Sequence, residues 1–171
     1  MREKNLHART LYELAARAAQ VASGSETRVL VNDRADVARA AMCDGVHLTT
    51  RSLDARTVRR AFGADFLVGV STHSLEEARE ARGGADFAVF GPVYDTPSKR
   101  AYGPALGTAR LAEAARALAP FPLVAIGGIT PDKFSELLGA GAAGVAAIGM
   151  FTEARDIDEI VSAIRDLKRD K

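Results

Sequence analysis

A loop rich in glycine and proline contains the residues that are best suited to bind an anion. Thr96, Ser98 and Lys99 lie in the stretch Gly-Pro-Val-Tyr-Asp-Thr-Pro-Ser-Lys, which begins at Gly91. Two hydroxyls two residues apart, with an ammonium group directly after them, can direct several hydrogen-bond donors at one cluster of phosphate oxygens. This spacing favours a diphosphate site, although the same residues in an isolated turn could serve only to cap backbone groups.

Two glycine turns indicate a second phosphate. Gly127 and Gly128 precede Thr130-Pro131, where a hydroxyl would cap a helix that begins at proline, and Gly149 follows the last apolar segment. Glycine lets the backbone approach an anion closely, and helix N-termini attract phosphate. The two turns therefore predict a phosphate cup, with a tight strand-to-helix connection as the alternative for either turn alone.

Further polar groups lie where apolar segments end. Asn32 and Asp33 offer an amide beside a carboxylate, which suits a magnesium ion shared with substrate phosphates. Asp33 could equally cap the next helix and pair with Arg34. His73 lies in a strand-to-helix loop, where an imidazole can transfer protons. His47 alternates with apolar neighbours, so we interpret it as a core residue.

Short apolar segments alternate with longer amphipathic stretches along the chain, which predicts an α/β fold with parallel strands and right-handed crossovers. Residues 11–22 and 157–167 carry apolar side chains on one helical stripe. Ser74 with Glu77 forms a capping box at another helix start. The strands are expected at residues 28–31, 45–48, 66–70, 86–90, 123–126 and 144–148.

The distribution of polar residues favours a closed barrel over an open, doubly wound sheet. The first expected strand leads into Val-Asn-Asp-Arg at 31–34 and lacks the Gly-x-Gly-x-x-Gly of a dinucleotide-binding sheet. Polar groups follow almost every strand instead, as they do on the C-terminal face of a TIM barrel. The sequence contains no internal linker, so residues 1–171 are expected to form a single domain.

The composition limits the partners. The chain has 171 residues, with 23 Lys and Arg against 22 Asp and Glu, so its net charge of +1 favours neither nucleic acid nor a membrane surface. No apolar run approaches the ~18–20 residues of a membrane span. The single cysteine, Cys43, excludes an internal disulfide, and the charged N-terminus does not resemble a signal peptide. We therefore expect a cytoplasmic protein that binds small molecules.

Taken in order, the motifs resemble those of the thiamine phosphate synthase and TenI family. The resemblance implies a (β/α)8 TIM barrel and an enzyme of thiamine biosynthesis. The synthase of this family is a transferase that joins a phosphorylated pyrimidine, hydroxymethylpyrimidine diphosphate, to thiazole phosphate and releases pyrophosphate. The matching stretches cover residues 2–4, 31–34, 44–48, 69–78, 91–99 and 125–129.

The resemblance also implies roles for single residues. Ser71 is similar to the catalytic hydroxyl next to the leaving group, Lys99 to a catalytic ligand of the departing pyrophosphate, and Asp33 to a magnesium ligand. The two glycines of the predicted cup correspond to the site of the thiazole phosphate. The substrate-binding positions that match the family are Arg2, Lys4, Asn32, Thr96, Ser98, Gly128 and Gly149.

One position departs from the synthase pattern. The family usually has a second aspartate as a magnesium ligand where this chain has Ser52. A neutral hydroxyl binds a cation more weakly than a carboxylate, and neighbouring Arg51 repels a cation. Asp54 would replace the ligand only if the loop were shifted by two residues. Mg2+ is thus the expected cofactor, at a site that has lost one charge.

Two other functions fit the same motifs. The TenI branch of the family isomerises a thiazole carboxylate phosphate with a histidine as the proton-transfer group, and His73 matches its position. A phosphate-binding or regulatory protein would keep the glycine turns without turnover. The donors at Arg2, Lys4, Asn32 and Lys99 favour the synthase, because a diphosphate requires such a set of cations.

The length adds one expectation. Relative to the family, the first strand, the first helix and most of the second strand are missing, and residues 1–4 resemble only the end of that strand. Strand edges that a complete barrel closes would then be exposed. We expect the chain to associate with itself, as a homo-oligomer or an aggregate.

Overall fold

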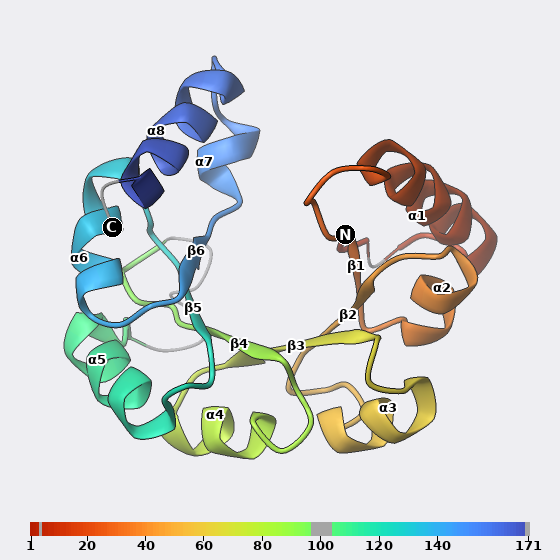
Figure 1. Cartoon of the computed structure of the whole chain (residues 1–171), viewed down its shortest axis with the longest axis horizontal. Coiled ribbons are helices and arrows are strands. Elements are labelled where there is room, and N and C mark those ends of the chain that lie inside the picture. The colour runs from red at the N-terminus through yellow and green to blue at the C-terminus, as the bar shows by residue number, and fades with distance from the viewer. Residues whose placement is uncertain (4, 97–103, 170–171) are drawn as a thin grey trace. The chain divides into compact units, whose positions relative to one another are not determined.

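The computed structural model describes residues 1–3, 5–96 and 104–169, in which helices alternate with strands (Figure 1). These residues form two compact units, each with a hydrophobic core. The first unit comprises Met1–Ser71 and Glu80–Phe87. The second comprises Thr72–Arg79 and the residues from Ala88 onward.

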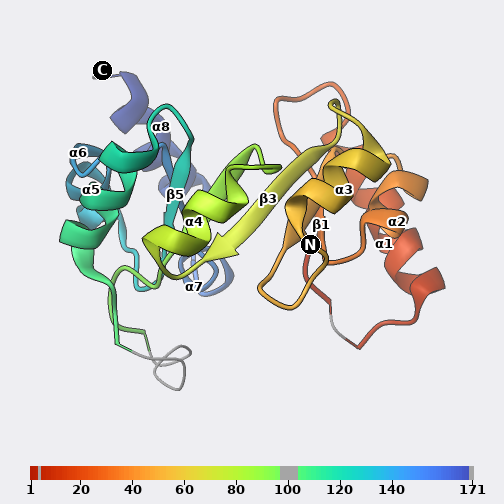
Figure 2. The same cartoon turned by 90° about the horizontal axis from the view of Figure 1, so that it is seen from below.

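The first unit contains three helices and three strands. In chain order they are α1 (Ala8–Ala22), β1 (Leu30–Asn32), α2 (Ala35–Ala40), β2 (Gly45–Leu48), α3 (Ala55–Phe62) and β3 (Leu67–Thr72). The last residue of β3 already belongs to the second unit. β2 pairs with both β1 and β3, in parallel. α2 packs against β1 and β2, and α1 packs against α2 (Figure 2).

The register of β1, β2 and β3 aligns three valines. Val31 is the partner of Val46, and Val46 is the partner of Val68. Each of these side chains is at most 1% exposed. Burying a valine stabilises a fold by roughly 1.5–3 kcal/mol relative to leaving it exposed. The valines therefore fix which face of the three strands belongs to the core.

The second unit continues the alternation of helices and strands. Its elements are α4 (Leu75–Ala81), β4 (Phe87–Phe90), α5 (Gly107–Leu118), β5 (Leu123–Ile126), η2 (Pro131–Lys133, a 3-10 helix), α6 (Phe134–Gly139), β6 (Gly144–Ala146), α7 (Gly149–Thr152) and α8 (Ile157–Arg169). The end of α4 and the start of β4 belong to the first unit. β5 pairs in parallel with β4 and β6. α6 packs against β6 (Figure 1). α8 packs against α6 and η2.

The strands form where the sequence predicts them, with differences at their ends. The predicted bounds 45–48 and 123–126 are confirmed, whereas the last strand ends two residues early, at Ala146. The first strand begins two residues late. Its predicted start binds the carboxylate of Asp44 instead, through the side chain of Arg28 (3.0 Å) and the backbone N–H of Val29 (2.7 Å).

The helix-start signals are partly confirmed. Ser74 Oγ accepts a hydrogen bond from the backbone N–H of Glu77 (3.1 Å), as a capping box requires. The Glu77 carboxylate accepts from the N–H of His73 (2.6 Å), one residue before the expected donor. Pro131 begins η2 as predicted, but the Thr130 side chain does not cap it.

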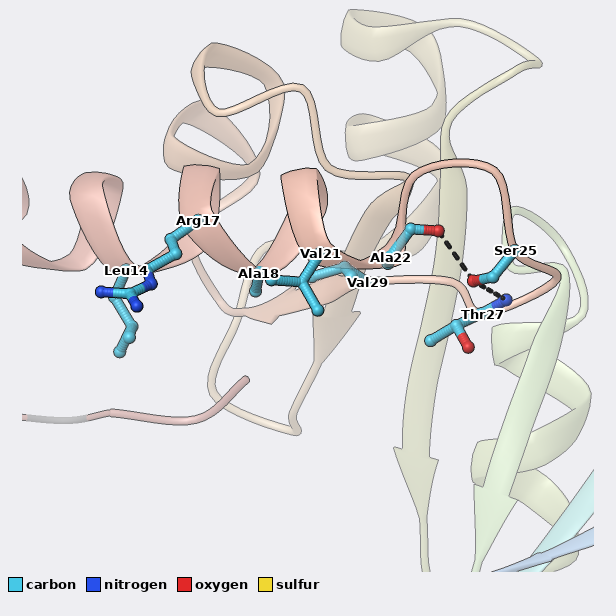
Figure 3. Close-up of a pocket in the computed structure, with 8 residues that line it drawn as sticks. All are labelled: Leu14, Arg17, Ala18, Val21, Ala22, Ser25, Thr27 and Val29. Carbon is cyan, nitrogen blue, oxygen red and sulfur yellow. Dashed lines mark hydrogen bonds between the residues drawn. The ribbon is translucent and has the colours of Figure 1, made fainter.

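An apolar groove of about 460 Å³ lies on the surface of the first unit, between α1 and the segment that leads to β1 (Figure 3). Its lining is Leu14, Arg17, Ala18, Val21, Ala22, Ser25, Thr27 and Val29. Val21 is 80% exposed and Leu14 is 42% exposed. Of the described site residues, none lines this groove. Exposed apolar patches often mark association surfaces, and self-association through this groove is a prediction that a charged substitution tests.

No helix in the described part of the chain has both the length and the apolar character of a membrane span.

Val21→Glu should weaken self-association, because a carboxylate in the groove opposes contact with a second apolar surface. Sedimentation velocity at several protein concentrations measures the effect. Met42→Glu is the matched control, since Met42 is 84% exposed but does not line the groove. We expect the control to sediment like the unsubstituted chain. Identical sedimentation of the Val21 variant and the unsubstituted chain would contradict a role for the groove.

Candidate active site

The first unit brings several predicted site residues to the carboxyl ends of its strands. Asn32 ends β1, Asp33 follows it, and Ser71 is the last residue but one of β3. Arg2 lies beside β1, because Met1 forms backbone hydrogen bonds along that strand. The ends of parallel strands share one edge of a sheet, which is where α/β enzymes bind their ligands.

The side chains at this edge are positioned by a row of residues on the face opposite the valines. Asn32 is the partner of His47, and His47 is the partner of Gly69. Side chains alternate along a strand, so this row points away from the valine core. A Cβ at Gly69 would lie 2.8 Å from His47 Nδ1 and 2.4 Å from Phe87 Cζ. Glycine is therefore required at position 69 to leave room for the two rings.

His47 is bound to a predicted catalytic residue. Its Nε2 lies 2.8 Å from Ser71 Oγ, and the tautomer of the ring decides which atom donates. Burial lowers the pKa of His47, an effect that the nearby carboxylate of Asp33 opposes. The lowered pKa favours the neutral imidazole at pH 7. The interpretation of His47 as a core residue was incomplete, because the half-buried ring holds the Ser71 hydroxyl.

Asp33 neither caps α2 nor pairs with Arg34, so the alternative to a magnesium ligand is wrong for this residue. Its backbone N–H donates to His47 O (2.9 Å), and its φ of 62° turns the chain sharply toward α2. Aspartate tolerates this left-handed conformation better than most residues. Its carboxylate accepts hydrogen bonds from Asn32 Nδ2 (2.5 Å), Thr49 Oγ1 (3.2 Å) and Ser52 Oγ. Arg34 pairs with Asp36 instead.

The oxygen atoms around Asp33 indicate how this site would hold the expected magnesium ion. The described residues contain no cluster of three His, Cys, Asp or Glu side chains that could hold a metal by themselves. Asp33 supplies one carboxylate among neutral hydroxyls, a set that fits a magnesium ion with most of its ligands from a diphosphate and water. Asp54 caps α3 through the N–H of Thr57 (2.9 Å) and is not a substitute ligand.

The remaining predicted residues are partly described. Thr96 ends the described segment 5–96, and Gly149 is the first residue of α7, soon after β6. Lys4, Ser98 and Lys99 lie outside the described residues. Their roles therefore stay predictions from the sequence.

The glycine turn of the second unit packs closely against the loop after β4. Gly127 and Gly128 have φ values of 102° and 61°, which glycine adopts without strain. A Cβ at Gly128 would lie 2.7 Å from Asp95 O and 2.9 Å from Tyr94 Cβ. The N–H of Tyr94 donates to Gly127 O (3.1 Å). Both glycines are therefore needed for the turn to lie against this loop.

His73 is exposed, and its ring is held by the backbone. Its Nδ1 forms a hydrogen bond with Gly91 O. Because a carbonyl oxygen can only accept, Nδ1 carries the proton, and a neutral ring then has its basic nitrogen at Nε2. This arrangement suits a proton acceptor at the end of β3.

Three residues to which the sequence analysis assigned no role lie around the glycine turn. Lys133 Nζ donates to Gly128 O (2.9 Å) and lies 4.4 Å from the centre of the Tyr94 ring. The Tyr94 hydroxyl donates to Glu136 (2.8 Å), and burial and this carboxylate raise the pKa of Tyr94 to about 12. The available signal was Pro131, which begins a helical turn between Gly128 and Lys133.

Comparison with known proteins identifies the family. The model of the thiamine monophosphate synthase family matches residues 1–151. The chain belongs to this family. Its relatives within the thiamine monophosphate synthase family include a thiamine-phosphate synthase from Anaeromyxobacter dehalogenans, 45% identical over 91% of this chain and 70% of the relative. The thiamine-phosphate synthase from Methanoculleus marisnigri is 39% identical over 97% of this chain and 79% of the relative.

Solved structures agree with this family assignment. Thiamine phosphate pyrophosphorylase from Pyrococcus furiosus matches with a TM-score of 0.89 and 31% identity, over 99% of this chain and 81% of that one. A 3-hexulose-6-phosphate synthase matches with a TM-score of 0.69 at 20% identity, which shows a shared fold only. The predicted TIM-type α/β fold is thus confirmed.

Proposed function

We propose that this member of the thiamine monophosphate synthase family is a transferase that joins hydroxymethylpyrimidine diphosphate to thiazole phosphate and releases pyrophosphate. The observation that carries the proposal is the polar cluster Asn32, Asp33 and Ser71 at the carboxyl ends of β1 and β3, with His47 bound to Ser71. The relatives named thiamine-phosphate synthase support it, at 39% and 45% identity. We place the reaction in the cytoplasm, in agreement with the composition.

The reaction exchanges one bond for another. The bond between the pyrimidine methylene carbon and the diphosphate oxygen breaks, and its electron pair leaves with pyrophosphate. The thiazole nitrogen then donates its lone pair to that carbon. Groups that stabilise the charge on the leaving oxygen lower the barrier, as does a fixed arrangement of the two substrates.

In the first unit, Ser71 is the proposed donor to the leaving oxygen. In the tautomer that we propose, with the proton on Nε2, the neutral His47 ring donates to Ser71 Oγ, which leaves the hydroxyl proton for the substrate. Arg2 contributes positive charge and Asn32 an amide N–H to the diphosphate. The hydrogen bond to His47 restricts the rotation of the Ser71 hydroxyl, so less entropy is lost when the substrate binds.

The other proposed substrate ligands follow the family pattern. Lys99 and Lys4 supply further charge to the diphosphate, and Thr96 and Ser98 supply hydroxyl donors. Gly128 and Gly149 bind the thiazole phosphate through backbone N–H groups, because glycine allows the anion to approach the backbone closely.

Asp33 is the proposed ligand for Mg2+. When bound, Mg2+ would act as a Lewis acid that neutralises charge on the phosphate oxygens. Hydrogen bonds from Asn32, Thr49 and Ser52 hold the Asp33 carboxylate in place. A site with one carboxylate needs the substrate's own phosphates to complete it.

A thiazole tautomerase is the second candidate, and the ring of His73 favours it. Held through Nδ1 by Gly91 O, this exposed histidine presents Nε2 as a base. His73→Ala should then abolish isomerisation of the thiazole carboxylate phosphate. Binding of thiazole phosphate without turnover in either assay would favour a non-catalytic, phosphate-binding role.

The synthase proposal predicts equal amounts of thiamine phosphate and pyrophosphate when the purified chain is incubated with Mg2+ and both substrates. Ser71→Ala should lower kcat about 10²-fold, the usual effect of losing one donor to a developing negative charge. Ser25→Ala, at an exposed serine beside α1, is the control and should keep the unsubstituted rate. The proposal fails if neither product forms.

Ser52→Asp should raise the affinity for a divalent cation about tenfold or more in the absence of substrate, because a second carboxylate adds charge to the site. Binding of Mn2+, followed by the loss of the free-ion signal in electron paramagnetic resonance, measures this directly. Ser52→Ala removes the hydroxyl without adding charge and should not raise the affinity for Mn2+. Equal Mn2+ affinity in the aspartate variant and the unsubstituted chain would contradict the placement of the metal at Asp33.

A further inference from the structure

We propose that Lys133 is a positioning residue for the thiazole phosphate, which it controls by fixing the peptide that follows Gly128. The inference rests on the proposed function, in which the glycine turn binds that phosphate. Lys133 reaches the turn from η2, with its Nζ 2.9 Å from Gly128 O. It acts through the backbone and is not itself required to touch the phosphate.

The planarity of the peptide bond links this contact to the phosphate site. In a trans peptide the C=O and the following N–H point in opposite directions. The ammonium that holds Gly128 O therefore also sets the direction of the Ile129 N–H. In the same way, the hydrogen bond from the N–H of Tyr94 to Gly127 O (3.1 Å) sets the direction of the Gly128 N–H. The directions of two successive N–H groups, those of Gly128 and Ile129, are thus set by hydrogen bonds to the carbonyl oxygens that precede them.

The glycines make such a contact necessary. A side chain at Gly128 would collide with Asp95 O and Tyr94 Cβ, so the position cannot be stiffened by substitution. Glycine populates more backbone conformations than any other residue, and an unbound turn would lose its shape easily. A charged donor on the carbonyl is a strong hydrogen bond and restricts the turn without occupying its interior.

The ring of Tyr94 in turn holds the Lys133 ammonium in position. The ammonium lies 4.4 Å from the ring centre, a favourable position for a cation over an aromatic face. The hydroxyl of Tyr94 donates to Glu136 (2.8 Å), in the first turn of α6. Lys133 therefore joins the glycine turn to the loop after β4.

The test compares Lys133→Met, which keeps an unbranched apolar chain, with Lys133→Arg, which keeps the charge and the donors. Calorimetry gives the Kd for thiazole phosphate, and steady-state kinetics give kcat and both KM values. We expect Lys133→Met to raise the Kd and the KM for thiazole phosphate about tenfold, the effect of losing one charged hydrogen bond. The KM for the pyrimidine diphosphate should stay within about twofold, and Lys133→Arg should recover most of the loss.

Controls separate positioning from folding. Arg110→Met, at an exposed position of α5, should leave all constants unchanged. Tyr94→Leu removes the ring face while Lys133 remains, and should raise the same KM by a smaller factor. This second variant keeps the proposal testable if Lys133→Met does not fold.

The outcomes distinguish this inference from the proposed function. If the unsubstituted chain binds thiazole phosphate without turnover and Lys133→Met weakens that binding, the synthase fails and the positioning role stands. Unchanged affinity in Lys133→Met, or an equal loss for both substrates, overturns the positioning role. Absence of thiazole phosphate binding in the unsubstituted chain also overturns it.

Discussion

The parallel register of β1, β2 and β3 is the constraint on which the first unit depends. Burial of the valine row Val31, Val46 and Val68 determines which face packs against the helices. Since side chains alternate along a strand, the polar row of Asn32, His47 and Gly69 must then lie on the opposite face. A slip of one residue would exchange the two rows and bury Asn32 and His47. Core packing thus places the polar end of the strands.

The second unit uses close backbone packing to the same end. Gly127 and Gly128 lie so near the loop after β4 that a side chain at either position would collide with it. This contact restrains the turn, and Lys133 restrains it further through the carbonyl oxygen of Gly128. The phosphate-binding property proposed for the turn therefore depends on residues that lie outside it. A glycine motif read without these neighbours gives an incomplete description of the site.

Much of the fold could be predicted from the sequence, because apolar periodicity is a local signal. The strand at 45–48 has its predicted bounds, since a continuous apolar run matches burial on the sheet. The early start predicted for β1 was wrong because Asp44, which binds Arg28 and Val29, is distant in the sequence. The family motifs identified Asn32, Asp33 and Ser71, and the structure places them at strand ends.

The contacts that organise the site could not be predicted in this way. His47 and Ser71 are 24 residues apart, so alternation predicted a core histidine but not what it binds. For Asp33 the sequence left a magnesium ligand and a helix cap paired with Arg34 as alternatives, and neither indicated the hydroxyls that bind it, which come from the loop after β2. Such partners depend on strand register, which follows from the assembled core and not from any one segment.

The space beside Gly69 connects this register with catalysis. A methyl group there would meet the rings of His47 and Phe87 and displace the imidazole from Ser71. The most direct measurement is therefore kcat of Gly69→Ala relative to the unsubstituted chain, with thermal unfolding as the control for folding. We predict a folded variant with kcat lowered at least about tenfold, because small displacements of catalytic groups have large effects on rate. An unchanged kcat in the folded variant would contradict the role of the polar row in placing Ser71.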